Sequence, residues 1–253
     1  YISNKKFDLA LNSLNFISEE DLIFSWYKNK KKSSIIKKQE NETAALDFLE
    51  KKFDGLKTNN VKILYDMGGI YKSFEKYDEA IKIYSKLLDL LDNRSKAYAD
   101  ILYRRGGSFE RIGDYETADK DLLDSLNITR ENPYVLNYLA YSWLERNYKI
   151  ELSMEMLKEA YDLRKNDPYI TDSLGWGYYL INDFENAEKY LKKAVELMPY
   201  DPIVNDHYGD ILWMLNRKIQ ARYFWNNVLN LDETDDEMKI DVKKKIIYGI
   251  EKT

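Results

Sequence analysis

A small residue recurs along this chain at a nearly constant interval, and no other feature of the sequence constrains the fold as much. Gly68, Gly106, Ala140, Gly175 and Gly209 are separated by 38, 34, 35 and 34 residues. Glycine inside a helix costs about 1 kcal/mol relative to alanine, so its repetition at one phase indicates a packing requirement. Two antiparallel helices approach closely only where one of them presents Gly or Ala. The interval therefore predicts an all-α chain built of repeated helical hairpins.

Large residues accompany the small ones at fixed distances. The best-defined unit contains Tyr71, Tyr77, Ala80 and Tyr84. Two further units have the same internal spacing and two have a looser version of it: Phe109, Tyr115, Ala118, Leu122; Tyr178, Phe184, Ala187, Leu191; Trp143, Ile150, Ser153, Leu157; and Leu212, Lys218, Ala221, Trp225. The unit with Trp143 has one extra residue before Ile150, which predicts a longer turn between its two helices.

Prolines preceded by Asn or Asp predict where three of the helices start. Proline in the first helical turn loses no hydrogen bond, and an Asn or Asp beside it caps the free backbone N–H groups. The three pairs are Asn132-Pro133, Asp167-Pro168 and Asp201-Pro202. Each of these starts opens a hairpin of the repeated unit.

This unit resembles the tetratricopeptide repeat, which has small residues at positions eight and twenty, large ones at four, seven, eleven and twenty-four, and Pro near thirty-two, here Pro199. The resemblance implies an all-α, right-handed superhelix, or α-solenoid, of about six helical hairpins plus a C-terminal capping helix. We expect one continuous solenoid domain over residues 1–253. Its expected parts are partial and degenerate hairpins in 1–56, five repeats in 61–231, and a capping helix in 235–250.

The first part of the chain follows the pattern less closely. Tyr1, Phe7, Ala10 and Leu14 match the repeat from its eleventh position onward, so we expect the sequence to begin inside a helix and to be a piece of a longer array. A degenerate hairpin without the small-residue signature is predicted at 19–31 and 41–56. We expect the basic stretch between its helices, residues 28–38, to be a solvated loop, with contact to an acidic partner or lipid head groups as the alternative.

The resemblance also implies which residues face a partner. In tetratricopeptide repeats, positions two, five, nine, twelve and thirteen of the first helix line the concave surface. The candidate partner-binding residues are Tyr134, Asn137, Tyr141, Tyr169, Asp172, Trp176, Tyr179, Asp206, Asp210 and Trp213. Aromatic anchors interleaved with Asn and Asp suit a polypeptide segment. The Lys and Arg clamp of the cochaperone members is missing, and the three aspartates would repel a carboxylate, so a neutral or basic segment is favoured.

Four strings are more specific than the general repeat: residues 137–146, 170–179, 205–213 and 221–225. They resemble the carboxy-terminal repeats of exported bacterial tetratricopeptide proteins, a family that includes the outer-membrane lipoprotein adaptor of a carboxyl-terminal processing protease. This resemblance implies a periplasmic or outer-membrane associated adaptor with an envelope protease as partner, the cytoplasm being the alternative. A different reading is a self-associating homo-oligomeric scaffold, joined through the terminal helix or through the first helix, where a truncated solenoid would expose the apolar residues Phe7, Leu11 and Leu14.

The sequence offers little material for catalysis. It has 253 residues, no cysteine, one histidine and a net charge of -5, and its longest apolar stretches fall short of a membrane span. His207 has Asp206 and Asp210 near it in sequence, but two carboxylates and one imidazole are an incomplete metal or hydrolytic site, so we expect a structural or groove-side histidine. Gly68-Gly69 and Gly106-Gly107 lie inside predicted helices, which argues against a phosphate loop. We therefore expect no enzyme, no cofactor, no metal and no nucleic-acid partner.

Overall fold

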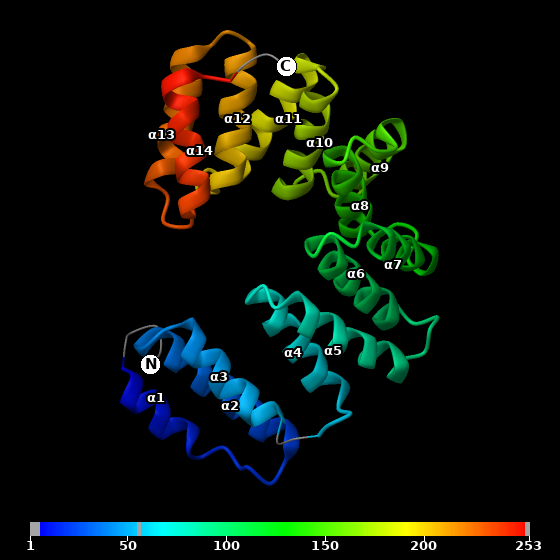
Figure 1. The fold of residues 1–253 in the computed structure, drawn as a ribbon, viewed down its shortest axis with the longest axis vertical. Helices are drawn as coiled ribbons and strands as arrows, with labels where there is room; N and C mark the ends of the chain where they lie inside the picture. Colours follow the sequence, from blue (N-terminus) through cyan, green and yellow to red (C-terminus); the bar gives the residue numbers. More distant parts are fainter. Residues whose placement is uncertain (1–5, 55–56, 251–253) are drawn as a thin grey trace. The chain divides into compact units, whose positions relative to one another are not determined.

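The structure is a computed structural model, and it describes residues 6–54 and 57–250. Within these ranges it contains fourteen α-helices and no β-strand, so the predicted all-α class is confirmed (Figure 1). Six pairs of neighbouring helices form hairpins, α2 with α3 through α12 with α13, and two helices lie outside them, α1 and α14. The described part of the chain thus contains the expected six hairpins and a closing helix.

The chain divides into two compact units, residues 1–92 and residues 93–253, and each is described by itself. The helices of the first unit are α1 (Phe7–Leu14), α2 (Leu22–Gln39), α3 (Glu42–Asp54), α4 (Val61–Ser73) and α5 (Tyr77–Leu90). Those of the second unit are α6 (Lys96–Arg111), α7 (Tyr115–Ile128), α8 (Pro133–Glu145), α9 (Ile150–Leu163), α10 (Pro168–Leu180), α11 (Phe184–Leu197), α12 (Pro202–Met214), α13 (Lys218–Asn230) and α14 (Asp236–Tyr248). The single continuous solenoid stays a prediction.

The recurring glycines lie where paired helices cross, as the interval predicts. Gly175 lies in α10, and a Cβ atom built on it would be 2.7 Å from Leu191 Cγ and 2.9 Å from the backbone nitrogen of Leu191 in α11. Gly209 lies in α12, and its Cβ would be 2.5 Å from two atoms of the Trp225 indole in α13. Real Cβ atoms do not approach other atoms this closely, so only glycine lets these helices pack at the observed distance.

The predicted helix starts and the longer turn are also confirmed. Asn132, Asp167 and Asp201 are N-caps whose side chains accept hydrogen bonds from backbone N–H groups of the first turn. The turn between α8 and α9 holds the extra residue, and it has two residues of positive φ, Asn147 at 52° and Lys149 at 46°. Asparagine is tolerated in this left-handed region, whereas lysine is strained there.

The expected basic loop at residues 28–38 is wrong, because α2 runs through it without a break. Lysine and serine are adequate helix formers, and the helix has an inward face that includes Trp26, Ser33 and Ile35. The Ser33 hydroxyl donates a hydrogen bond of 2.9 Å to the Ala45 carbonyl oxygen of α3. Ser33 and Ala45 are twelve residues apart, as are Gly175 and Ala187, so this hairpin has a small-residue signature after all.

The helix before it, α1, is present as predicted from Phe7 to Leu14, while Tyr1 of the same match lies outside the described residues. Ala10 and Leu14 are buried in a cluster with Ile35, and Phe7 and Leu11 are partly buried against it. The expectation that Leu14 forms an exposed apolar edge is therefore wrong, because the side chain packs on α2.

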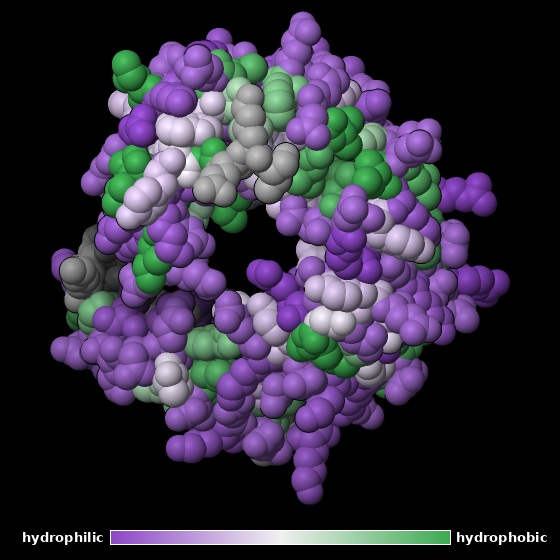
Figure 2. Space-filling view, turned by 45° about the horizontal axis from the view of Figure 1, so that its top comes forward, coloured by the Kyte–Doolittle hydropathy of each residue, from purple (hydrophilic) through white to green (hydrophobic). Residues whose placement is uncertain are grey.

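The last helix, α14, closes the second unit. It packs against α13, and its Val242 lies in one core cluster with Trp225 and Val228. The predicted C-terminal capping helix is thus confirmed. Hydrophilic residues predominate on the face of the molecule drawn in Figure 2, with hydrophobic residues gathered in small groups. No helix in the described ranges is both long enough and apolar enough to cross a membrane.

Candidate functional site

The first helices of three successive hairpins, α8, α10 and α12, carry the candidate residues in matching registers. They are neighbours, since α8 contacts α10 and α10 contacts α12. The second position of each helix holds an exposed apolar side chain: Tyr134 is 46% exposed, Tyr169 59% and Ile203 55%. We call these three residues the apolar row. Single exposed apolar residues are ordinary on a protein surface, but a row with one member per repeat is a regular feature of this face.

The fifth position of each helix holds an amide or a carboxylate, namely Asn137, Asp172 and Asp206. In all three side chains the Oδ1 atom is buried and has no hydrogen-bond partner within the described part of the chain. A buried acceptor without a donor costs roughly 1–3 kcal/mol, so most such atoms in proteins are paired. Three unpaired acceptors in one register are therefore an unusual property of this face.

A stack of aromatic rings crosses from α10 to α12. The Trp176 ring lies 4.5 Å from the Tyr179 ring at 10° and 4.0 Å from the His207 ring at 13° between ring planes. The Trp176 indole N–H donates a hydrogen bond of 2.7 Å to Glu145 Oε1 of α8. Trp176 thus links the first helices of three successive hairpins, and its side chain is only partly buried. Stacking of this kind holds the rings in a fixed orientation.

His207 pairs with Asp172, its Nδ1 atom lying 2.9 Å from Asp172 Oδ2, and both side chains are buried. Burial alone would lower the pKa of His207, but the hydrogen bond and negative charge of Asp172, with the charges of Asp210 and Asp206, raise it above the ordinary value. The expected neighbours in sequence are not its partner. Its partner, Asp172, belongs to the preceding repeat. The spacing of residues within one helix could not indicate this pairing.

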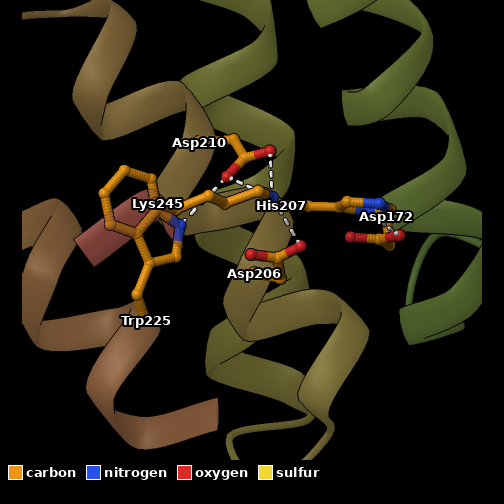
Figure 3. A network of polar contacts seen from close by, with 6 residues as sticks. All are labelled: Asp172, Asp206, His207, Asp210, Trp225 and Lys245. Carbon is orange, nitrogen blue, oxygen red and sulfur yellow. Dashed lines mark hydrogen bonds and ion pairs between the residues drawn. The ribbon is translucent and has the colours of Figure 1, made fainter. Parts of the chain in front are cut away.

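Asp206 and Asp210 are bound by a lysine from α14. The Lys245 ammonium group lies 2.7 Å from Asp206 Oδ2 and 2.8 Å from Asp210 Oδ2, and the Trp225 indole N–H donates a bond of 2.9 Å to Asp210 Oδ1 (Figure 3). Burial and the neighbouring Asp206 charge raise the pKa of Asp210 to about 6, although Lys245 opposes the shift. Burial would lower the pKa of Lys245, but the two carboxylates raise it.

Trp213 also contacts the segment that follows α14. Its indole N–H donates a hydrogen bond of 3.0 Å to the carbonyl oxygen of Ile250. Gly249 precedes this contact with φ at 78°, and a Cβ atom built there would lie 1.8 Å from the Trp213 ring. Three candidate residues, Asp206, Asp210 and Trp213, therefore contact the segment that closes the second unit.

The other seven candidates lie on α8 and α10: Tyr134, Asn137, Tyr141, Tyr169, Asp172, Trp176 and Tyr179. Their role in binding stays a prediction. Sequence reasoning missed Lys245 and the Asp172–His207 pair. Within the described ranges, no three His, Asp or Glu side chains are grouped so that they could hold a metal ion.

Helical hairpins that repeat along a chain and cross at small residues define an α-solenoid protein. The tetratricopeptide repeat model matches residues 61–90 and 173–201, so these two segments are tetratricopeptide repeats. This fold is that of protein–protein interaction scaffolds. The closer likeness to the exported adaptor of a processing protease remains a prediction.

A TPR repeat-containing protein of Pseudomonas aeruginosa, PA4667, is 29% identical over 120 residues, which are 47% of this chain and 18% of that protein. Among solved structures, a thermophilic TPR protein of Thermus thermophilus, TTC0263, has a TM-score of 0.63 at 16% identity, covering 74% of this chain and 99% of its own. A tetratricopeptide repeat protein of Parabacteroides merdae scores 0.62 at 16% identity, covering 88% and 85%. Pseudomonas aeruginosa pilF scores 0.59 at 19%, covering 75% and 85%. At such identities these structures establish the fold alone.

Proposed function

We propose that the face formed by α8, α10 and α12 binds an extended segment of another protein, and that the chain is a non-catalytic scaffold. The observation that carries the proposal is the apolar row, which places one exposed apolar side chain on each of three successive repeats. The same helices carry partly buried aromatic rings, Tyr141, Trp176 and Tyr179. Exposed aromatic anchors near polar acceptors are typical of protein-binding surfaces.

The dimensions of the face suit an extended segment. Packed helices are separated by about 8–10 Å, and an extended chain rises about 3.4 Å per residue. A segment running across α8, α10 and α12 would therefore meet an equivalent register position about every third residue. The Oδ1 atoms of Asn137, Asp172 and Asp206 are buried and unpaired, so a side-chain rotation that exposes them would offer acceptors to the N–H groups of this segment.

A place in the bacterial cell envelope, as adaptor to a protease, is the finer form of the proposal. It is supported by the four strings that resemble exported bacterial tetratricopeptide proteins. Cell fractionation of the native host tests it directly. Recovery of the protein in the cytoplasmic fraction alone would contradict the envelope location without affecting the binding proposal.

The binding proposal is tested by selecting random twelve-residue displayed peptides on the whole chain and measuring the affinity of those recovered. We expect Tyr134→Ala with Tyr169→Ala to weaken binding by about tenfold or more, since loss of an interface anchor costs at least 1–2 kcal/mol. The matched control is Tyr200→Ala with Tyr223→Ala, because these tyrosines are 80% and 63% exposed outside the row. Equal affinities of the two double variants would contradict the proposal.

A further inference from the structure

Three carboxylates at or beside this face differ from those acidic groups of the second unit that pair with an arginine or lysine. Asp119 forms an ion pair with Arg146, Asp121 with Arg105, Glu188 with Arg217, and Asp206 and Asp210 with Lys245. By contrast, Glu110, Glu145 and Asp172 form no ion pair with a lysine or arginine of the described chain. Their partners are the Tyr138 hydroxyl, the Trp176 indole N–H and the His207 imidazole, in that order.

These three carboxylates come from three helices, α6, α8 and α10, and the negative charge of each acts on Tyr141. Asn137, Tyr141 and Glu145 are spaced by four residues in α8, so they lie one above another on a single side of that helix. Glu110 reaches this side from α6 and accepts a hydrogen bond of 2.9 Å from Tyr138, which precedes Tyr141 by three residues. We call Glu110, Tyr141, Glu145 and Asp172 the Tyr141 subsite.

The subsite lacks a positive charge to balance its carboxylates, and one of its buried oxygens lacks a hydrogen-bond donor. Burial raises the pKa of the Tyr141 hydroxyl, and the negative charges of Glu145, Asp172 and Glu110 raise it further. Asp172 is 6% exposed, and its Oδ1 atom is buried without a hydrogen-bond donor, while Oδ2 is bound to His207. A buried carboxylate oxygen without a hydrogen-bond donor destabilises the folded chain. A cationic donor that binds this oxygen would remove that cost and gain a charge-assisted hydrogen bond. Glu145 is exposed, which leaves the subsite open to another molecule.

We propose that the Tyr141 subsite binds an arginine or lysine side chain of the polypeptide segment held on this face, an inference that rests on the proposed function. The chain itself provides the precedent one repeat onward, where the Lys245 ammonium group lies between Asp206 and Asp210. The negative charges of Glu110, Glu145 and Asp172 would attract a guanidinium or ammonium group at the Tyr141 subsite in the same way. The basic residue fixes the register of the segment along α8 and α10.

The test begins with the peptides selected above on the whole chain. We expect them to contain an arginine or lysine at a constant distance from their apolar residues. Replacing that arginine by citrulline, which has the same shape without the charge, should weaken binding by about tenfold or more, because charge-assisted hydrogen bonds are the strong ones. In the Glu110→Gln Glu145→Gln double variant, the arginine and citrulline peptides should bind with nearly equal affinity.

Glutamine retains the acceptor oxygens for Tyr138 and Trp176, so the double variant keeps both hydrogen bonds. The matched control is Glu155→Gln Glu159→Gln, which removes the same charge from exposed positions of α9. Peptides that bind in an apolar-row-dependent manner without a basic residue overturn this inference and leave the proposed function standing. Peptides whose binding ignores Tyr134 and Tyr169 overturn both.

Free polyamines carry the same cationic groups, so spermidine is the second arm of the experiment. A subsite built for a side chain within a segment gains most of its affinity from the rest of that segment. We therefore expect spermidine to displace the selected peptide only at concentrations far above the peptide's own dissociation constant. Displacement at comparable concentrations would overturn the assignment to a polypeptide side chain.

Discussion

The two units contain the same three-part contact in different surroundings. In the first unit, the Trp26 indole N–H donates to Asp66 Oδ2 at 3.1 Å and the Lys30 ammonium group lies 2.8 Å from Asp66 Oδ1. In the second unit, Trp225 and Lys245 make the same contacts with Asp210 at 2.9 and 2.8 Å. The side chain of Asp66 is 24% exposed and that of Asp210 is 6% exposed. The chemistry is the same, but water reaches only one of the two carboxylates freely.

This difference determines what each contact contributes. An ion pair near the surface is worth about 0–1 kcal/mol, because water replaces a lost partner. A buried carboxylate has no such replacement, and removal of its partner leaves an uncompensated charge in a poorly solvated position. The Asp210 contact has a second carboxylate, Asp206, on the same ammonium group, which increases the dependence on Lys245. We therefore expect the contact at Asp66 to be a minor one and that at Asp210 to hold α14 in place.

The largest effect should come from Lys245→Met, which leaves Asp206 and Asp210 facing each other without a cation. Breaking a buried ion pair in this way costs about 3–5 kcal/mol, and we expect a loss of about 3 kcal/mol in the second unit. Because repeats unfold locally at their ends, hydrogen exchange of the α14 amides is the measurement of choice. The matched control is Lys244→Met, whose partner Asp241 is exposed, so the change should leave the protection of the α14 amides nearly as in wild type. Equal protection in the two variants would show that Asp210 is effectively solvated.

The next largest effect is a dependence on pH that Asp210 produces. Its pKa in the folded protein is about 6, above the ordinary value of 3.8, so the native state binds an additional proton between these limits. The contribution of Asp210 to the free energy of unfolding should therefore fall as the pH rises from about 4 to 6, by about 2–3 kcal/mol, and stay level above that range. Urea unfolding of wild type and Asp210→Asn across this range isolates the contribution, since the variant lacks the titrating group. A constant difference between the two proteins across the range would contradict the assignment.

The fold could be predicted because it depends on the spacing of small residues and on helix capping, both of which can be read from the sequence. Gly175 and Gly209 recur at one phase because backbone approach leaves no space for a side chain, and Asp167 and Asp201 mark helix starts through short-range capping. Ser33 was missed because a hydroxyl within a lysine-rich stretch resembles a loop residue, although its spacing to Ala45 carried the signal.

The polar part of the site could be predicted less well. Lys245 reaches the site only because of the way α14 packs on the preceding helices. Nothing in the sequence distinguishes it from the neighbouring lysines of the same helix. The pairing of His207 with Asp172 depends on contact between helices of successive repeats. Position within a repeat predicted which residues share a face, whereas the partner of each charge follows from tertiary packing.

A smaller effect compares the two indoles. Trp225→Phe and Trp26→Phe remove the same N–H donor and a similar volume from buried positions, so the loss of packing should be alike in both. The carboxylates then differ, because water can replace the donor at Asp66 and much less readily at Asp210. We expect Trp225→Phe to cost about 1 kcal/mol more than Trp26→Phe in urea unfolding of the whole chain. The reverse order would mean that packing around the two rings, rather than the hydrogen bond, sets the difference.

The smallest effect is expected for Lys30→Met. The Lys30 side chain is 40% exposed, and Asp66 keeps both its contact with water and its hydrogen bond from Trp26 after the change. The cost should be about 0.5 kcal/mol at low salt and should shrink as ionic strength screens the exposed pair, measured by urea unfolding at two salt concentrations. A buried pair is screened much less, so the cost of Lys245→Met should persist in high salt. If Lys30→Met cost about 2 kcal/mol and that cost persisted in high salt, Asp66 would have to be as poorly solvated as Asp210, and exposure would no longer account for the difference between the two contacts.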